Sequence, residues 1–186
     1  MANKKKARVL RSKVTFRGPL FRVTSETVAE PGGITVRRDV VRHGGSAVVL
    51  AVADGPRGPS VLLERQYRHA AKDFLWELPA GHIDRGETAL AAGRRELLEE
   101  TGYTARRWER ALVFYPSPGF LDETMSVYLA RGLKTGRAQP ESDELIATRL
   151  FPLAAALRMA TRGVIRDGKT LAALFWFAHG KGRTGR

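Results

Sequence analysis

Residues 81–103 read GHIDRGETALAAGRRELLEETGY, and this stretch decides how the chain is organised. Its second half predicts a helix from about Thr88 onward, because sequence rich in alanine and leucine has high helix propensity. The predicted helix ends at Gly102, since glycine readily adopts the left-handed conformation that caps a helix. The stretch therefore predicts a loop that leads into a helix.

Three glutamates of the predicted helix share one face. Glu96, Glu99 and Glu100 stand at positions i, i+3 and i+4, which lie together on a helix. Like charges at this spacing repel each other, so we expect a positive group against the face, either basic side chains or a bound cation. Arg95 offsets part of the repulsion but does not neutralise three carboxylates. Ligands that are all oxygen favour Mg2+ or Mn2+ over zinc, whereas the plain alternative is an acidic face that water solvates.

The spacing of glycine, glutamate and arginine in this stretch is more specific than the acidic face alone. A glycine is followed after five residues by a glutamate, and after seven more by Arg-Glu-apolar-x-Glu-Glu-x-Gly-apolar. The matching positions are Gly81, Glu87, Arg95, Glu96, Leu97, Glu99, Glu100, Gly102 and Tyr103. This pattern resembles the Nudix box. The resemblance implies a hydrolase that uses divalent metal to cleave a nucleoside diphosphate linked to another group.

The resemblance also implies roles for residues in and beside the box. The metal ligands that it implies are the carbonyl oxygen of Ala80 and the carboxylates of Glu96, Glu99 and Glu100. Mg2+ is the expected cofactor, with Mn2+ as the alternative. Glu99 and Arg95 are counted among the catalytic residues, and Arg95 is expected to hold the loop to the helix through an ion pair with Glu87. Gly81 is expected to supply a backbone conformation that the turn requires.

Three shorter runs resemble one branch of the family, the pyrophosphatases of ADP-ribose and nucleoside-diphosphate sugars. These runs are LERQYR at 63–68, ELPAG at 77–81 and SPGF at 117–120. Arg68 is expected to bind substrate phosphate, because a guanidinium matches phosphate oxygens bidentately. The alternative for Arg68 is a surface arginine at the end of a strand. Pro118 and Gly119 are the other residues expected to contact substrate.

The general base is expected outside the box, because carboxylates that coordinate metal have a lowered proton affinity. In the ADP-ribose branch, a loop glutamate just before an apolar strand that leads to a proline takes this role. Glu144 fits, because Leu145 and Ile146 follow it and Pro152 comes later. Glu141 and Asp143 lie in the same loop, and the plain alternative is that all three acids are solvated.

Composition bounds the class of protein. The chain has 186 residues, of which 43% are hydrophobic, and this is enough for one domain with a substantial core. It has no cysteine, so disulfides and thiolate metal sites are excluded. No stretch approaches the roughly 18 continuous apolar residues of a membrane helix, and a cytoplasmic location is expected.

The net charge of +13 resembles that of a nucleic-acid-binding protein, but its distribution disfavours this function. Residues 1–13 carry six basic side chains and residues 181–186 carry three, with no acid in either stretch, so the two tails hold nine of the thirteen charges. Basic tails of this kind are commonly disordered solubilising arms. We therefore expect disordered tails at 1–13 and 181–186, and no nucleic-acid partner.

The resemblance implies an α/β (α+β) fold, the Nudix α/β/α sandwich of a mixed sheet between helices. The Nudix domain is expected at 46–180, with an added N-terminal antiparallel β region at 14–45. Within that region, Pro31-Gly32-Gly33 predicts a hairpin between residues 20–29 and 34–42. In the ADP-ribose branch such N-terminal strands build a dimer, so a homodimer is expected by resemblance alone.

The remaining elements follow from apolar runs and turn residues. Strands are predicted at 46–53, 61–67, 74–78, 111–115, 124–130 and 145–151, with a mobile loop at 133–143. Helices are predicted at 153–161 and 170–178, the second packing Phe175, Trp176 and Phe177 on the core.

Three functions remain open on the sequence. The first is hydrolysis of ADP-ribose to AMP and ribose 5-phosphate. The second is cleavage of another nucleotide sugar, such as a GDP- or ADP-hexose, since the branch motifs do not separate these substrates. The third is a non-catalytic Nudix-fold protein that binds nucleic acid, against which the intact box glutamates argue.

Overall fold

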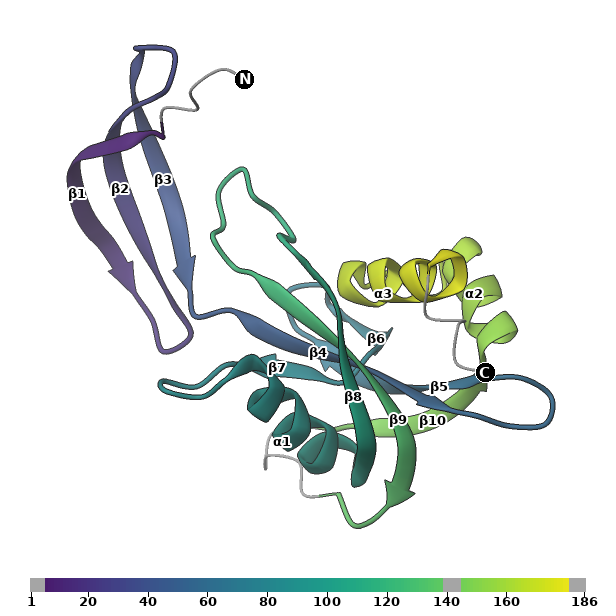
Figure 1. Cartoon of the computed structure of the whole chain (residues 1–186). Coiled ribbons are helices and arrows are strands. Elements are labelled where there is room, and N and C mark those ends of the chain that lie inside the picture. Colours follow the sequence, from purple (N-terminus) through teal and green to yellow (C-terminus); the bar gives the residue numbers. More distant parts are fainter. Residues whose placement is uncertain (1–5, 139–144, 181–186) are drawn as a thin grey trace. The chain divides into compact units, whose positions relative to one another are not determined.

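The described residues of the chain fall into two units. The computed structural model describes residues 6–138 and 145–180 (Figure 1). Residues 6–45 and 115–124 belong to the first unit, and the other described residues belong to the second. No helix in the described ranges is both long enough and apolar enough to cross a membrane.

The first unit is built on a three-stranded antiparallel sheet in the order β1-β2-β3. The strands are β1 (Arg8–Arg17), β2 (Phe21–Ala29) and β3 (Thr35–His43). The predicted hairpin is confirmed, because β2 pairs with β3 from Phe21 opposite His43 to Ala29 opposite Thr35. Gly33 in its turn has a φ of 81°, a left-handed conformation that favours glycine.

Strand β1 corrects the expectation of a disordered tail over residues 1–13. The strand begins at Arg8, so residues 8–13 of the expected tail pair with β2. Every side chain of β1 is exposed, and its basic residues are of the kind that edge strands carry to avoid pairing with other chains. The sequence misses this strand because backbone pairing, rather than burial of a hydrophobic face, holds it.

A partly buried ion-pair network joins β2, β3 and the segment 115–124 within this unit. Arg42 on β3 donates to the Glu26 carboxylate at 2.7 Å and to the Asp122 carboxylate at 3.0 Å. The hydrogen bond from Arg42 holds the pKa of Glu26 below its usual value. The backbone N–H of His43 also donates to Asp122, at 2.8 Å. The network therefore fixes the loop that carries Pro118 against the sheet of its own unit.

The second unit is a seven-stranded mixed sheet between helices. Its main order is β10-β5-β4-β9-β8, with β6 paired to β5 and β7 paired to β4. The strands are β4 (Ser46–Ala53), β5 (Ser60–Arg68), β6 (Asp73–Glu77), β7 (Ala80–His82), β8 (Tyr103–Phe114), β9 (Met125–Thr135) and β10 (Ala147–Pro152). The helices are α1 (Ala89–Thr101), α2 (Leu153–Thr161) and α3 (Gly168–His179). Only β4 and β9 run parallel among the described pairs, so the sheet is mixed as predicted.

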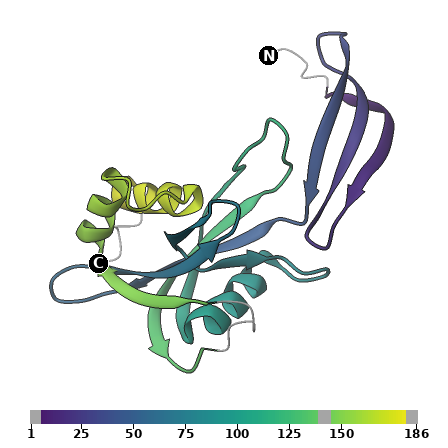
Figure 2. The ribbon, with the colours of Figure 1, turned by 180° about the vertical axis from the view of Figure 1, so that it is seen from behind.

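Alternate residues of β4 face the two helical layers, which makes the unit an α/β/α sandwich (Figures 1 and 2). Val48 and Leu50 share a buried cluster with Phe177 of α3. Val49 packs in the opposite cluster, with Leu97 of α1. Successive side chains of a strand point to opposite faces, so a strand covered on both faces is apolar throughout. The predicted fold class and the predicted strand at 46–53 are confirmed.

Three local predictions differ from the structure. Strand β8 begins at Tyr103, directly after α1, rather than at residue 111, and β9 extends to Thr135 into the loop predicted for 133–143. The charged residues of β8 hide its strand pattern, because most of them are exposed while backbone pairing with β9 holds the strand. Phe175 is 38% exposed and does not pack in the core, whereas Phe177 is buried.

Both ends of α1 follow the local signals of the sequence. The Thr88 side chain accepts a hydrogen bond from the backbone N–H of Ala91 at 3.2 Å and so caps the first turn. Gly102 has a φ of 70° and its N–H donates to the Leu98 carbonyl at 2.8 Å. A Cβ atom added to Gly102 would lie 2.6 Å from the backbone nitrogen of Ala138.

Replacing Gly102 with alanine should destabilise the fold. The left-handed φ alone costs an L-residue about 1 to 2 kcal/mol, and the contact with Ala138 adds to this cost. The matched control is Gly168→Ala at the start of α3, where an added Cβ meets no atom within 4 Å. Urea unfolding followed by circular dichroism should show a lower free energy of unfolding for Gly102→Ala alone. Equal losses in both variants would contradict the account of the helix end.

Candidate active site

The chain passes very close to α1 at Gly81. A Cβ atom built on Gly81 would lie 1.9 Å from Oε1 of Glu96, so no other residue fits without movement. The φ angle of Gly81 is not among the positive ones, which corrects the expectation that the turn needs its backbone freedom. The glycine is needed for close approach, and it lets β7 lie against the carboxylate of Glu96.

Arg95 is the centre of the ion pairs around the box. Its guanidinium donates to Glu87 at 3.1 Å and 3.2 Å, to Glu96 at 2.6 Å and to Glu99 at 3.1 Å. It also donates to the carbonyl oxygen of His82 at 3.0 Å. Hydrogen bonding to Glu87, followed by the charge of Glu96, raises the pKa of Arg95. The expected Glu87–Arg95 pair is therefore present, within a larger cluster that also orients two of the predicted metal ligands.

The third predicted carboxylate, Glu100, takes a different environment. Glu96 and Glu99 meet at Arg95, whereas Glu100 is buried and accepts a hydrogen bond from the backbone N–H of Ala80 at 3.1 Å. Within residues 6–138 and 145–180, no three Asp, Glu or His side chains gather into a ready metal-binding group. The carboxylates of the box glutamates thus lie on the same helix, but they do not converge on a single metal position.

A buried ion-pair cluster lies on the strands next to the box. Glu77 of β6 is 1% exposed and accepts two hydrogen bonds from Arg68 of β5, each at 2.9 Å. Lys169 of α3 also donates to Glu77. Burial alone would raise the pKa of Glu77, but the hydrogen bond from Arg68 and the charge of Lys169 hold it below its usual value. Arg68, predicted to bind substrate phosphate, therefore has two of its donors engaged by Glu77, while its side chain remains 39% exposed.

Glu64 is a buried acid that the sequence reasoning missed. It lies directly opposite Glu77 in the pairing of β5 with β6, and it is 0% exposed. Neither of its carboxylate oxygens has a hydrogen-bond partner of ordinary geometry among the described residues. Burial raises the pKa of Glu64 to about 8, although the charge of Lys169 acts in the opposite direction. The available signal was a charged residue two positions after Leu62, on the strand face that packs against α1.

The residues present suit a divalent cation. Glu64 supplies two buried oxygens without donors, and Glu100 is close enough to act on its pKa. Beside them, the close approach at Gly81 brings the backbone of β7 to the carboxylate of Glu96. A donor set made only of oxygen atoms is the kind that Mg2+ and Mn2+ prefer.

The remaining predicted residues lie elsewhere or outside the described ranges. Pro118 and Gly119 belong to the first unit, where they line a hollow of about 280 Å3 together with Arg42 and Tyr115. Glu144 and its alternatives Glu141 and Asp143 lie outside the described residues.

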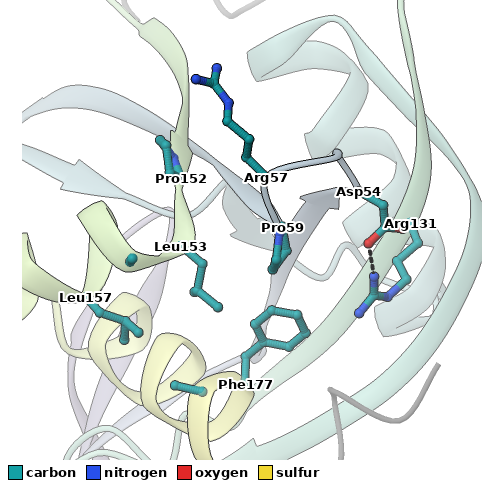
Figure 3. Close-up of a pocket in the computed structure, with 10 residues that line it drawn as sticks. Asp54, Arg57, Pro59, Arg131, Pro152, Leu153, Leu157 and Phe177 are labelled. Atoms are coloured by element: carbon teal, nitrogen blue, oxygen red, sulfur yellow. Dashed lines mark hydrogen bonds and ion pairs between the residues drawn. The ribbon is translucent and has the colours of Figure 1, made fainter. Parts of the chain in front are cut away.

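A separate pocket of about 420 Å3 opens in the second unit between α2, α3 and the loop after β4 (Figure 3). Asp54 and Arg131 form an ion pair at its wall, and the Arg131 guanidinium lies over the Phe177 ring, 5.5 Å from its centroid. Leu153 and Leu157 line its apolar side. None of the residues predicted for the active site lines this pocket, so it is distinct from the carboxylate cluster.

The geometry defines an α/β/α protein with an acidic site where α1 meets the sheet. The chain matches the family model of the NUDIX domain over residues 42–174. It therefore belongs to the Nudix hydrolase family, whose members generally need divalent metal ions.

Relatives of known activity align over most of the chain. An ADP-ribose pyrophosphatase of Bacillus subtilis is 34% identical over 161 residues, which cover 86% of this chain and 85% of the relative. An ADP-ribose pyrophosphatase of Mycobacterium tuberculosis is 38% identical over 164 residues, which cover 87% of this chain and 78% of the relative. A GDP-mannose pyrophosphatase of Cronobacter sakazakii is 33% identical over 147 residues, which cover 74% of this chain and 75% of the relative.

A solved structure supports the fold. The crystal structure of an ADP compounds hydrolase superposes with a TM-score of 0.79 and covers 96% of this chain and 97% of its own. The sequences are 21% identical, so this likeness concerns the fold.

Removing the Lys169 amine should destabilise the second unit. Lys169→Met leaves the buried Glu77 with Arg68 as its one ion-pair partner among the described residues, and breaking a buried pair costs about 3 kcal/mol. The matched control is Lys134→Met at the exposed end of β9, which should change the free energy of unfolding little. Denaturant unfolding of both variants measures the difference. Unchanged stability of Lys169→Met would show that the Glu77 cluster does not hold α3 to the sheet.

Proposed function

We propose that this chain hydrolyses the pyrophosphate bond of ADP-ribose, releasing AMP and ribose 5-phosphate. The observation that carries the proposal is the assembled box, in which Arg95 holds Glu87, Glu96 and Glu99 while Glu100 contacts the chain at Ala80. Two relatives that cover most of the chain are ADP-ribose pyrophosphatases, and this supports the choice of substrate.

The proposed roles follow the chemistry of the side chains. The divalent cation would be held by the carbonyl oxygen of Ala80 and the carboxylates of Glu96, Glu99 and Glu100. Mg2+ is the proposed metal and Mn2+ is the alternative. When bound, such a cation neutralises phosphate oxygens and lowers the pKa of a coordinated water. Arg95 keeps Glu96 and Glu99 oriented by its hydrogen bonds. The exposed part of Arg68 presents positive charge to substrate phosphate.

The reaction needs a proton acceptor and a water. The water oxygen forms a bond to one phosphorus while the bond from that phosphorus to the bridging oxygen breaks. The departing phosphate keeps the bridging oxygen, and the general base takes the proton of the water. We propose Glu144 as this base and Pro118 and Gly119 as further substrate contacts.

Cleavage of a GDP-hexose is the second candidate, supported by the GDP-mannose pyrophosphatase among the relatives. A panel of ADP-ribose, ADP-glucose, GDP-mannose, NADH and diadenosine polyphosphates, with the phosphate products identified, tests the choice. We expect the highest kcat/KM for ADP-ribose, with AMP as a product. A clear preference for GDP-mannose would contradict this choice and support cleavage of a GDP-hexose. Binding of nucleic acid without turnover of any compound would instead support the third possibility, a non-catalytic protein that binds nucleic acid.

We propose that the chain forms a homodimer, in keeping with its N-terminal sheet and the resemblance to the ADP-ribose branch. Ultracentrifugation of the full chain and of a chain lacking residues 1–12 gives the mass of each. The deletion removes residues of β1 that pair with β2. A loss of dimer and of activity at low protein concentration would place β1 in the assembly.

Substituting Glu100 with glutamine should severely reduce turnover. The change keeps the shape of the side chain and removes its charge, so metal binding and activity should each fall about 10- to 100-fold or more. Glu109→Gln is the matched control, because Glu109 is exposed on β8. Steady-state hydrolysis of ADP-ribose across a Mg2+ titration measures both effects. A Glu100→Gln enzyme with the wild-type rate in excess Mg2+ would refute the assignment.

Glu144→Gln should lower kcat while leaving metal affinity nearly unchanged. Loss of a general base typically reduces the rate about 10²- to 10⁴-fold. Glu141→Gln serves as the comparison, since it removes a neighbouring charge of the same loop. The proposal fails if Glu144→Gln is fully active and Glu141→Gln or Glu99→Gln is inactive.

A further inference from the structure

Glu64 has no role in the box, yet it sits in an unusual environment for an acid. It is fully buried on β5, and both of its oxygens lack a hydrogen-bond partner of ordinary geometry among the described residues. A buried carboxylate without donors is strongly unfavourable, and proteins tolerate one where a proton or a metal ion compensates it. Glu64 therefore needs a group that compensates its buried carboxylate.

The nearby cations are engaged by a different acid. Arg68 gives two hydrogen bonds to Glu77, and Lys169 donates to Glu77 while also pairing with Asp167 at 3.1 Å. Glu64 receives a hydrogen bond from neither cation. The described ion pairs therefore leave Glu64 without a direct hydrogen bond from a cation, and the charges of Lys169 and Arg68 offset its burial only in part.

The side chain of Glu64 points to the face of the sheet that α1 covers. Leu62, two residues earlier on β5, packs in the cluster that contains Leu97 of α1. Side chains two residues apart in a strand point to the same face, so Glu64 faces the helix that carries the box. The carboxyl group of Glu100, also on α1, interacts with that of Glu64. Two acids from different elements therefore meet beside the box.

We propose that Glu64 is a ligand of the divalent cation, acting together with Glu100 from outside the box. This inference rests on the proposed function for the presence of a cation in the site. Mg2+ is usually bound by one or two carboxylates, with waters and substrate phosphates completing its coordination, so this pair of acids is sufficient. The cation supplies a positive charge in direct contact with Glu64, whereas Arg68 and Lys169 donate their hydrogen bonds to Glu77.

Manganese binding in the absence of substrate tests the assignment. Mn2+ is titrated into metal-stripped wild type and Glu64→Gln, and the free ion is measured by electron paramagnetic resonance. We expect binding at least about tenfold weaker in Glu64→Gln, as for the loss of a metal-supporting group. Thermal unfolding gives a second readout, because Mn2+ should raise the melting temperature of the variant less than that of the wild type.

Two further variants keep the result interpretable. Glu64→Asp retains the charge but shortens the side chain, so it should fold and still bind Mn2+ more weakly than wild type. Glu109→Gln removes an exposed acid and should bind Mn2+ as wild type does. Wild-type affinity in both Glu64 variants overturns the inference, even if the wild-type protein hydrolyses ADP-ribose. Weakened Mn2+ binding in a protein that cleaves no compound of the panel would support the inference while the proposed substrate fails.

Discussion

The ion pairs on Glu77 are the interaction on which the second unit depends. Arg68 reaches this carboxylate from β5 and Lys169 reaches it from α3, a residue 92 positions away in sequence. The next residue, Leu78, donates its N–H to the buried Thr170 hydroxyl of α3 at 2.8 Å. Because Ala80 and Gly81 follow at once, the contacts that hold α3 to the sheet also fix the start of the box. Ala80 can then reach Glu100.

Repulsion between carboxylates is resolved differently at two neighbouring places. Around Arg95, one guanidinium donates hydrogen bonds to Glu87, Glu96 and Glu99, which offsets part of their repulsion without neutralising all three charges. Glu64 has no such partner among the described residues and lies in a fully buried position. The first arrangement orients two box glutamates of α1 through hydrogen bonds from one protein group. The second is the place where the proposed metal ion would offset the burial of a carboxylate.

Local signals in the sequence predicted much of this structure. Thr88, Gly102 and the apolar run of β4 each determine an element through nearby residues, and all three predictions are confirmed. β1 and β8 were missed or shortened because their side chains are largely charged and exposed, so that only backbone pairing reveals them. The box glutamates were found through their spacing. The pairing of Glu77 with Lys169 and the burial of Glu64 depend on elements that meet only in the folded chain.

The central claim is that a divalent cation is held where the carboxylates of β5 and α1 meet. An anomalous difference map from a crystal of the wild-type protein soaked in Mn2+ tests it most directly. The account predicts a manganese peak within coordination distance of both Glu64 and Glu100. A map in which manganese contacts only Glu96 and Glu99, with Glu64 bonded to protein groups alone, would contradict it.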